Sequence, residues 1–320
     1  MNCEVSTMTT QTITKRSSVA GTARVAEPKK RHGLGFYAAW ACLIFLLLIT
    51  IFPFIWMLRS SLMTNSELVS SPGTLWPENP TLDAYRRVFG MTSPEESLAQ
   101  GGAGASINFW LYLRNSLIVA SVVTVGQTLF SAMAAYAFSR LTWKGRDAIF
   151  ALFLSALMVP SIFTMIPNFV LIKQLGLLNT FPGIVLPTFF MTPFAIFFLR
   201  QFFLGVPREI DEAAMIDGAG PFKVFFRVIC PMASAPIITL AVLTFINAWN
   251  DYMWPLLVGQ SDNVRVLTVA LGIFRSQKPQ GSPDWTALMA AALVAALPIV
   301  ILFVILGKRI VNSIGFSGIK

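Results

Sequence analysis

The sequence predicts an all-α membrane protein whose chain crosses the bilayer six times. Three observations lead there: 55% of the 320 residues are hydrophobic, only 12% are charged, and the apolar residues form long blocks. Soluble domains carry about 25% charged residues, so this chain has roughly half of the usual complement. A helix needs about 20 apolar residues to cross the hydrocarbon core, and six blocks of the chain reach that length. The composition therefore excludes the soluble enzymes.

The six blocks define the predicted transmembrane helices. They run over residues 36–58, 109–138, 148–172, 181–204, 234–258 and 285–306. The first block follows the basic residues 29–31, as the apolar region of a signal peptide would. It is too long for a signal peptide, however, and no small-residue cleavage site follows it. We therefore expect a retained helix.

The segments between and beyond the blocks complete the predicted organisation. Residues 1–35 are rich in Ser, Thr, Lys and Arg and predict a disordered tail. Residues 59–108 predict a loop on the outer side, 109–307 a transmembrane core that includes the loop 205–231, and 308–320 a second tail. If both termini are cytoplasmic, the inner segments hold 16 of the 24 basic residues. Inner loops of membrane proteins are enriched in Lys and Arg, so the sequence predicts this orientation.

Several partner and site classes are disfavoured by composition. The net charge is +9, but the sequence contains no dense basic patch interleaved with aromatic residues, the pattern typical of nucleic-acid binding. The cysteines Cys3, Cys42 and Cys230 lie far apart and have neither disulfide nor metal-site spacing. The single histidine, His32, lies in the N-terminal tail. We therefore expect no catalytic residue, no metal and no cofactor in this chain.

The loop 205–231 predicts two short helices. Pro207 suits the first helical position, and the acidic residues that follow favour the positive end of the helix dipole. Gly218 lies where a glycine would end the first helix, and Pro221 can open a second helix that Pro231 stops before the fifth span. Two interpretations of the pair remain open. It is a docking element for a soluble partner, or an interfacial helix on the membrane surface.

Polar and aromatic residues gather near the outer end of the fifth predicted span. A carboxylate at the centre of a transmembrane helix costs roughly 2.5–3.5 kcal/mol, so polar groups there normally face protein or water. Aromatic and amide groups also suit sugar rings and hydroxyls. A structural or gating role ranks somewhat ahead of direct contact with a transported molecule, because Trp and Tyr also form interfacial belts. The candidates are Asn247, Trp249, Asn250, Asp251 and Tyr252.

The loop 205–231 also carries a resemblance. It looks like the EAA loop, the motif of permease subunits of bacterial binding-protein-dependent ABC importers. Its motif positions here are Glu212, Ala213, Ala214, Gly218, Val228 and Pro231, with Cys230 where the family usually has Leu. Further segments are similar to the sugar-importing branch, and in particular to the smaller permease of maltose-type importers: 77–89, 115–120, 134–146, 159–160, 166–167, 175–180, 212–220, 249–256 and the C-terminal GFSGIK. The N-terminal tail and residues 98–106 fall outside the pattern.

The resemblance implies a division of labour. A solute-binding protein outside the cytoplasm delivers sugar, a second permease completes a heterodimer in the bacterial inner membrane, and two ATPase subunits drive the cycle. The chain contains no G-x-x-x-x-G-K-[ST] loop, so ATP and Mg would be bound by the ATPase. The substrate implied is a carbohydrate, most readily an oligosaccharide, with glycerol phosphate or another polyol derivative as the alternative. The residues implied to couple transport to the ATPase are Glu212, Ala213, Ala214, Asp217, Gly218 and Pro231.

Two other classes fit the residues less well. A polytopic membrane enzyme would need paired carboxylates or a histidine cluster at the membrane surface. The acidic cluster in residues 209–217 is already explained by helix capping and docking. A stand-alone secondary transporter would in many folds show inverted repeats, and no internal repeat is evident.

Overall fold

The computed structural model describes residues 34–100, 102, 107–276 and 283–315. Within these ranges the chain forms helices and no strand, which confirms the predicted all-α class. Most of the predicted N-terminal tail, most of the stretch 98–106 and the end of the C-terminal tail lie outside the described residues. The chain divides into two compact units, Met1–Thr50 and Ile51–Lys320. Every described helix that begins after residue 61 belongs to the second unit.

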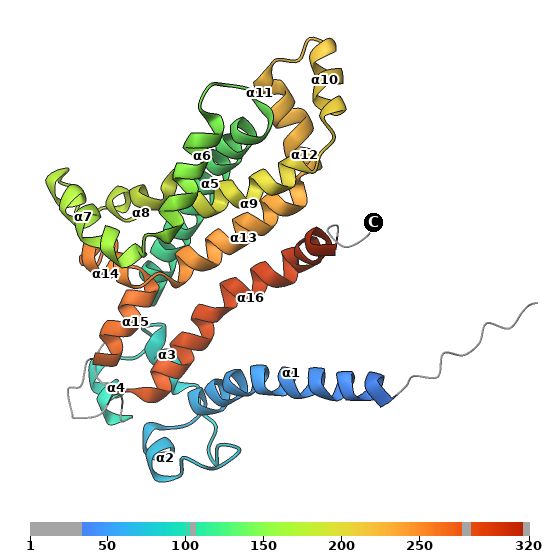
Figure 1. Cartoon of the computed structure of the whole chain (residues 1–320). Helices are drawn as coiled ribbons and strands as arrows, with labels where there is room; N and C mark the ends of the chain where they lie inside the picture. Colours follow the sequence, from blue (N-terminus) through green and yellow to red (C-terminus); the bar gives the residue numbers. More distant parts are fainter. Residues whose placement is uncertain (1–33, 101, 103–106, 277–282, 316–320) are drawn as a thin grey trace, which may run out of the picture. The chain divides into compact units, whose positions relative to one another are not determined.

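The helices are named in Figure 1 in chain order. The first ones are α1 (Leu34–Ser61), α2 (Asn65–Ser70), α3 (Asp83–Val88), α4 (Pro94–Ala99), α5 (Phe109–Arg140), α6 (Arg146–Ser155), α7 (Ser161–Gln174), α8 (Phe181–Phe189) and α9 (Pro193–Leu204). The later ones are α10 (Arg208–Ile216), α11 (Pro221–Val224), α12 (Cys230–Met232), α13 (Ser234–Asn250), α14 (Met253–Val258), α15 (Leu267–Ser276) and α16 (Trp285–Gly315). A 3₁₀ turn (η1, Ala156–Met158) and a π-helical turn (η2, Phe225–Ile229) connect some of them.

Three described helices are long and apolar enough to cross a membrane alone: Gly35–Ser61, Phe109–Arg140 and Trp285–Gly307. Three more candidates are helix pairs bent at a short break, by 100° between α6–η1 and α7, by 44° between α8 and α9, and by 83° between α11–α12 and α13. By length and composition the number of spans is therefore between three and six, and six requires each bent pair to count as one.

The predicted third and fourth spans, 148–172 and 181–204, are not continuous helices. The third is broken at Val159, whose ψ of 115° is extended, because the ring of Pro160 excludes the preceding residue from the helical region. The fourth is broken before Pro193, where Thr192 is extended and its hydroxyl accepts the Ala195 N–H at 3.4 Å. The predicted fifth span, 234–258, is also divided, since α13 ends at Asn250 and α14 begins at Met253.

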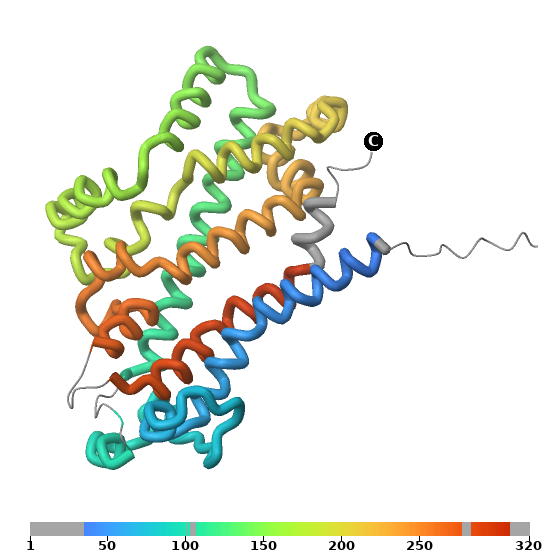
Figure 2. Tube along the Cα trace, turned by 60° about the horizontal axis from the view of Figure 1, so that its bottom comes forward, coloured from blue at the N-terminus to red at the C-terminus, as the bar shows by residue number. Residues whose placement is uncertain are grey.

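Helix α5 lies at the centre of the second unit and packs against α8, α9 and α13, as Figure 2 shows along the trace. Small side chains make the approach close, because Ala120, Ser131 and Ala135 are fully buried on α5. The tightest point is Gly126. A β-carbon there would come within 2.3 Å of the Phe189 ring, so any larger residue would force α5 and the end of α8 apart.

At one end of the unit, a buried polar network fastens the segment 59–100 to the start of α16. The Arg87 guanidinium donates to both carboxylate oxygens of Asp284, at 2.8 and 3.2 Å, and to the Thr286 hydroxyl at 2.8 Å. Asn65 donates to the same carboxylate at 2.9 Å, and Gln100 accepts from Arg87 at 3.1 Å. Because the pair is almost fully buried, it ties α2, α3 and α4 to α16.

Candidate functional site

The loop between α9 and α13 folds into a helix pair, here called the knob (residues 207–232). Its first helix, α10, begins at Arg208, one residue later than predicted, because Pro207 precedes the helix with an extended ψ of 137°. Gly218 has a φ of +77°, and its N–H donates to the Met215 carbonyl while the next N–H donates to the Ala214 carbonyl. This Schellman arrangement needs a left-handed residue after the helix, which confirms Gly218 as the cap.

The second half of the knob is irregular. After α11 the chain makes one π-helical turn, in which the Cys230 N–H donates to the Phe225 carbonyl five residues earlier. Pro231 has no N–H, and its ring would clash with the carbonyl of residue 227 in a regular helix. The wider turn relieves that clash. The prediction that Pro231 ends the helix is therefore wrong: the helix continues to Met232, and the chain bends at Ala233.

A buried ion pair joins the knob to the last residue of α5. The guanidinium Nη1 of Arg140 lies 3.2 Å from a carboxylate oxygen of Asp211 on α10, and their side chains are only 3% and 11% exposed. The other terminal nitrogen, Nη2, donates to the backbone carbonyls of Phe203 and Val206. The sequence analysis counted Arg140 only among the 16 basic residues of the inner segments. The residue that could have indicated this role is Asp211. It lies on the same face of α10 as the half-buried Ala214, so its carboxylate faces inward and needs a cation.

The candidate coupling residues lie together on the knob, and most of their side chains are exposed. Ala214 is the half-buried member; the exposed members are Glu212, Ala213, Asp217, Gly218 and Pro231. Large apolar side chains are exposed beside them, with Ile216 at 87% and Phe222 at 70%. A helix pair that is fastened by a buried ion pair and exposes apolar side chains beside acidic residues has the character of an interaction surface.

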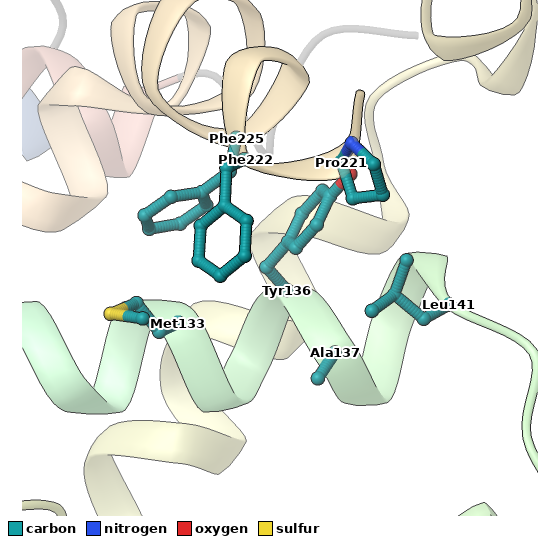
Figure 3. A pocket seen from close by; sticks show the side chains of 7 residues that line it. All are labelled: Met133, Tyr136, Ala137, Leu141, Pro221, Phe222 and Phe225. Carbon is teal, nitrogen blue, oxygen red and sulfur yellow. The ribbon is translucent and has the colours of Figure 1, made fainter. Parts of the chain in front are cut away.

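Two hollows flank the knob where it meets α5. Figure 3 shows the apolar one, of about 210 Å³, which is lined by Met133, Tyr136, Ala137, Leu141, Pro221, Phe222 and Phe225. The second, of about 280 Å³, lies on the Arg140 side, and its lining includes Arg208 and Glu212. Both hollows are lined jointly by side chains of the knob and of the end of α5.

The candidates from the fifth span do not form one site. Trp249 is buried; its indole N–H donates to the Ala295 carbonyl of α16 at 3.2 Å, and its ring stacks on Phe245 at 5.8 Å. Trp249 therefore holds α13 against α16. Asn247 and Asn250 are exposed one turn apart on another face of α13, and the Asn250 amide donates to the Ile246 carbonyl at 2.9 Å.

Asp251 and Tyr252 lie in the break between α13 and α14. The backbone carbonyl of Asp251 accepts the Thr268 hydroxyl at 2.8 Å. The Tyr252 ring lies over Gly272 of α15, where a β-carbon would come within 2.8 Å of it. The break is thus fastened to α15. Among the described residues, no group of three or more His, Cys, Asp or Glu side chains could hold a metal ion.

Alanine substitutions separate the two groups on α13. Trp249→Ala should lower the free energy of unfolding by about 3–5 kcal/mol, because it leaves a cavity against α16. Asn250→Ala should change it by less than about 0.5 kcal/mol, since this side chain is exposed and its amide donates within its own helix. Thermal unfolding of the purified protein in detergent measures both. Equal losses for the two variants would contradict the division.

Comparison with protein families gives a match over most of the chain. Residues 116–315 match the family model described as "Binding-protein-dependent transport system inner membrane component". The matched region includes most of α5, the knob, α13 and α16.

Curated relatives match over nearly their whole length. The chain is 31% identical to the arabinooligosaccharides transport system permease protein AraQ of Halalkalibacterium halodurans, over 86% of this chain and 93% of that protein. It is 33% identical to the trehalose/maltose transport system permease protein MalG of Thermococcus litoralis, over 87% and 94%. It is 30% identical to the sn-glycerol-3-phosphate transport system permease protein UgpE of Brucella abortus, over 85% and 93%.

A solved structure has the same fold. It is a chain of a bacterial ABC transporter involved in the import of the acidic polysaccharide alginate, with a TM-score of 0.69 over 86% of this chain and 95% of that one. At 22% sequence identity, the likeness concerns the fold alone.

Proposed function

The chain belongs to the family of inner membrane components of binding-protein-dependent transport systems, and from this premise we propose that it is a permease subunit of an ATP-driven carbohydrate importer. Its cargo is an oligosaccharide delivered by a solute-binding protein outside the cytoplasm. The support is that AraQ and MalG, named for oligosaccharide and disaccharide transport, are 31% and 33% identical over nearly their full length. UgpE, named for glycerol phosphate transport, favours a polyol phosphate as the second candidate cargo.

The observation that carries the coupling part of the proposal is the knob. It is held to the end of α5 by the buried Arg140–Asp211 pair, yet it exposes Ile216 and Phe222. A segment that only connects two spans would need neither feature. In this proposal the exposed face enters a cleft on an ATPase subunit, which binds ATP and Mg. The residues that make the contact or shape it are Glu212, Ala213, Ala214, Asp217, Gly218 and Pro231.

The remaining parts of the assembly follow from the same proposal. Two ATPase copies hold two knobs, one on this chain and one on a different permease subunit. The knob and both termini then lie on the cytoplasmic side of a bacterial inner membrane. Closure of the ATPases on ATP moves the knobs and shifts the bundle from an inward-facing to an outward-facing state. In this scheme the exposed Asn247 and Asn250 border the translocation path, and Asp251 and Tyr252 belong to its outer gate.

Uptake by the reconstituted complex tests this function. The chain is co-expressed with a partner permease, the ATPase and the solute-binding protein (the receptor) from its own genome. The complex is then reconstituted in vesicles with ATP inside. Radiolabelled oligosaccharides and glycerol phosphate are then offered outside. We expect uptake of one cargo class that requires both receptor and ATP. Uptake that persists without receptor or without ATP would contradict the function.

A further inference from the structure

Arg140 connects three segments through one side chain. It is the last residue of α5, it pairs with Asp211 on α10, and it donates to backbone carbonyls at residues 203 and 206. A planar guanidinium with five donors suits such a junction, because it keeps several partners in fixed geometry at once. The knob is therefore fastened both to the end of α9 and to the end of α5.

Helix α5 reaches from this junction to the opposite end of the unit. It has 32 residues in one uninterrupted helix, which corresponds to a length of about 48 Å. The bent pairs α6–α7, α8–α9 and α12–α13 are all interrupted, and α16 contains a proline. Of the described helices in contact with the knob, α5 is thus the longest uninterrupted one, well beyond the 12 residues of α9 and the 17 of α13.

The far end of α5 is fastened to the loop between α14 and α15. The Asn115 amide donates to the backbone carbonyls of Asn263 and Arg265, both at 3.0 Å. The Ser116 hydroxyl accepts the backbone N–H of Leu267 at 2.8 Å. Asn115 and Ser116 are buried, so the loop 260–267 is tied to α5 by hydrogen bonds shielded from water.

We propose that Arg140 is a positioning residue that makes α5 move together with the knob, so that a displacement of the knob reaches the loop 260–267 through Asn115 and Ser116. The inference rests on the proposed function, since it assumes that an ATPase displaces the knob. Without the Arg140–Asp211 pair, the exposed face of the knob still binds the ATPase. The knob then moves without α5, and ATP is hydrolysed without transport.

The test removes both charges at once, so that no unpaired charge is left buried. The variant is Arg140→Gln with Asp211→Asn in the full complex. Its matched control is Arg146→Gln with Asp147→Asn, a pair close to Arg140 in the chain whose carboxylate is 75% exposed. Three quantities are measured: the affinity of the ATPase for the permeases, ATP hydrolysis, and uptake of cargo per ATP hydrolysed.

We expect the double variant to bind the ATPase with unchanged affinity and to support ATP hydrolysis, while uptake per ATP falls about tenfold. The control pair should leave all three quantities unchanged. A double variant that keeps wild-type uptake per ATP overturns the inference. Loss of ATPase binding also overturns it, because the pair would then only shape the docking face. A wild-type complex that shows no ATP-dependent uptake would instead refute the proposed function.

A second measurement follows the movement of the loop 260–267, at the far end of α5, directly. In a complex whose native cysteines are replaced by serine, Gln260→Cys places a thiol at an exposed position of the loop 260–267. Its rate of maleimide labelling should change on addition of ATP, and this change should vanish when Arg140 and Asp211 are replaced. If the double variant does not insert into the membrane, Arg140→Lys serves instead. Lysine keeps the positive charge but lacks the several donors of the planar guanidinium, so it should reduce the ATP-dependent change in labelling rate. A change that keeps its wild-type size in either variant overturns the inference.

Discussion

Replacing Gly218 with glutamate is expected to reduce ATP-driven uptake about 100-fold while the protein still inserts and folds. Gly218 has a φ of +77° and follows the end of α10. A β-carbon there would meet no atom of this chain within 4 Å, so the new side chain extends into open space. Under the proposed function, that space is occupied by the ATPase. Uptake and ATPase affinity of the reconstituted complex are the measurements.

Two smaller substitutions separate backbone strain from contact with the partner. An alanine at a left-handed position costs about 1–2 kcal/mol, so Gly218→Ala measures the strain. Gly218→Asn adds a side chain that tolerates this conformation, so it should keep stability closer to wild type while weakening ATPase affinity. Wild-type uptake by the glutamate variant would exclude Gly218 from the contact with the ATPase.

Replacing Arg87 with alanine is expected to lower the free energy of unfolding by about 3–5 kcal/mol, because it leaves the Asp284 carboxylate buried without its cation. The same change at Arg86 provides the control. Arg86 is adjacent in sequence, its side chain is 65% exposed, and its carboxylate partner is 4.0 Å away. An exposed pair of this kind contributes about 0–1 kcal/mol. Thermal unfolding of the two variants in the same detergent gives the comparison.

The network around Asp284 adds a further check on this expectation. Arg87→Ala combined with Asp284→Asn should recover part of the lost stability, since no charge remains buried and unpaired. The recovery is incomplete, because Asn65 and Thr286 also bond to the carboxylate. Equal effects of Arg86→Ala and Arg87→Ala would show that the buried pair does not hold α3 to α16.

Local signals in the sequence predicted the elements that depend on neighbouring residues. Gly218 and Pro221 predicted the end of one knob helix and the start of the next, because a left-handed cap and a first-turn proline act within one turn. The apolar blocks predicted the long helices α5 and α16. Pro160 and Pro193 could also have indicated where the third and fourth predicted spans are interrupted. A hydropathy average over about 20 residues conceals such interruptions.

Pairs distant in sequence could not be predicted in this way. Arg87 and Asp284 are 197 residues apart, and the charge of either alone suggests only an outer loop. Arg140 counted only as one of 16 basic residues in the inner segments, although its guanidinium is buried against α10. The role of Trp249 was also undetermined, because an indole at the end of a span suits a lipid interface as well as a contact with α16.

The bent pairs also bear on how the chain enters the membrane during synthesis. Helices α8 and α9 have 9 and 12 residues, and each is too short to cross the hydrocarbon core, which requires about 20. Neither can partition into lipid as an independent unit, whereas α5 and α16 can. We expect each bent pair to leave the translocon as one nascent segment and to acquire its bend only when it packs against α5. The biogenesis of this protein would then depend on α5 being in the bilayer first.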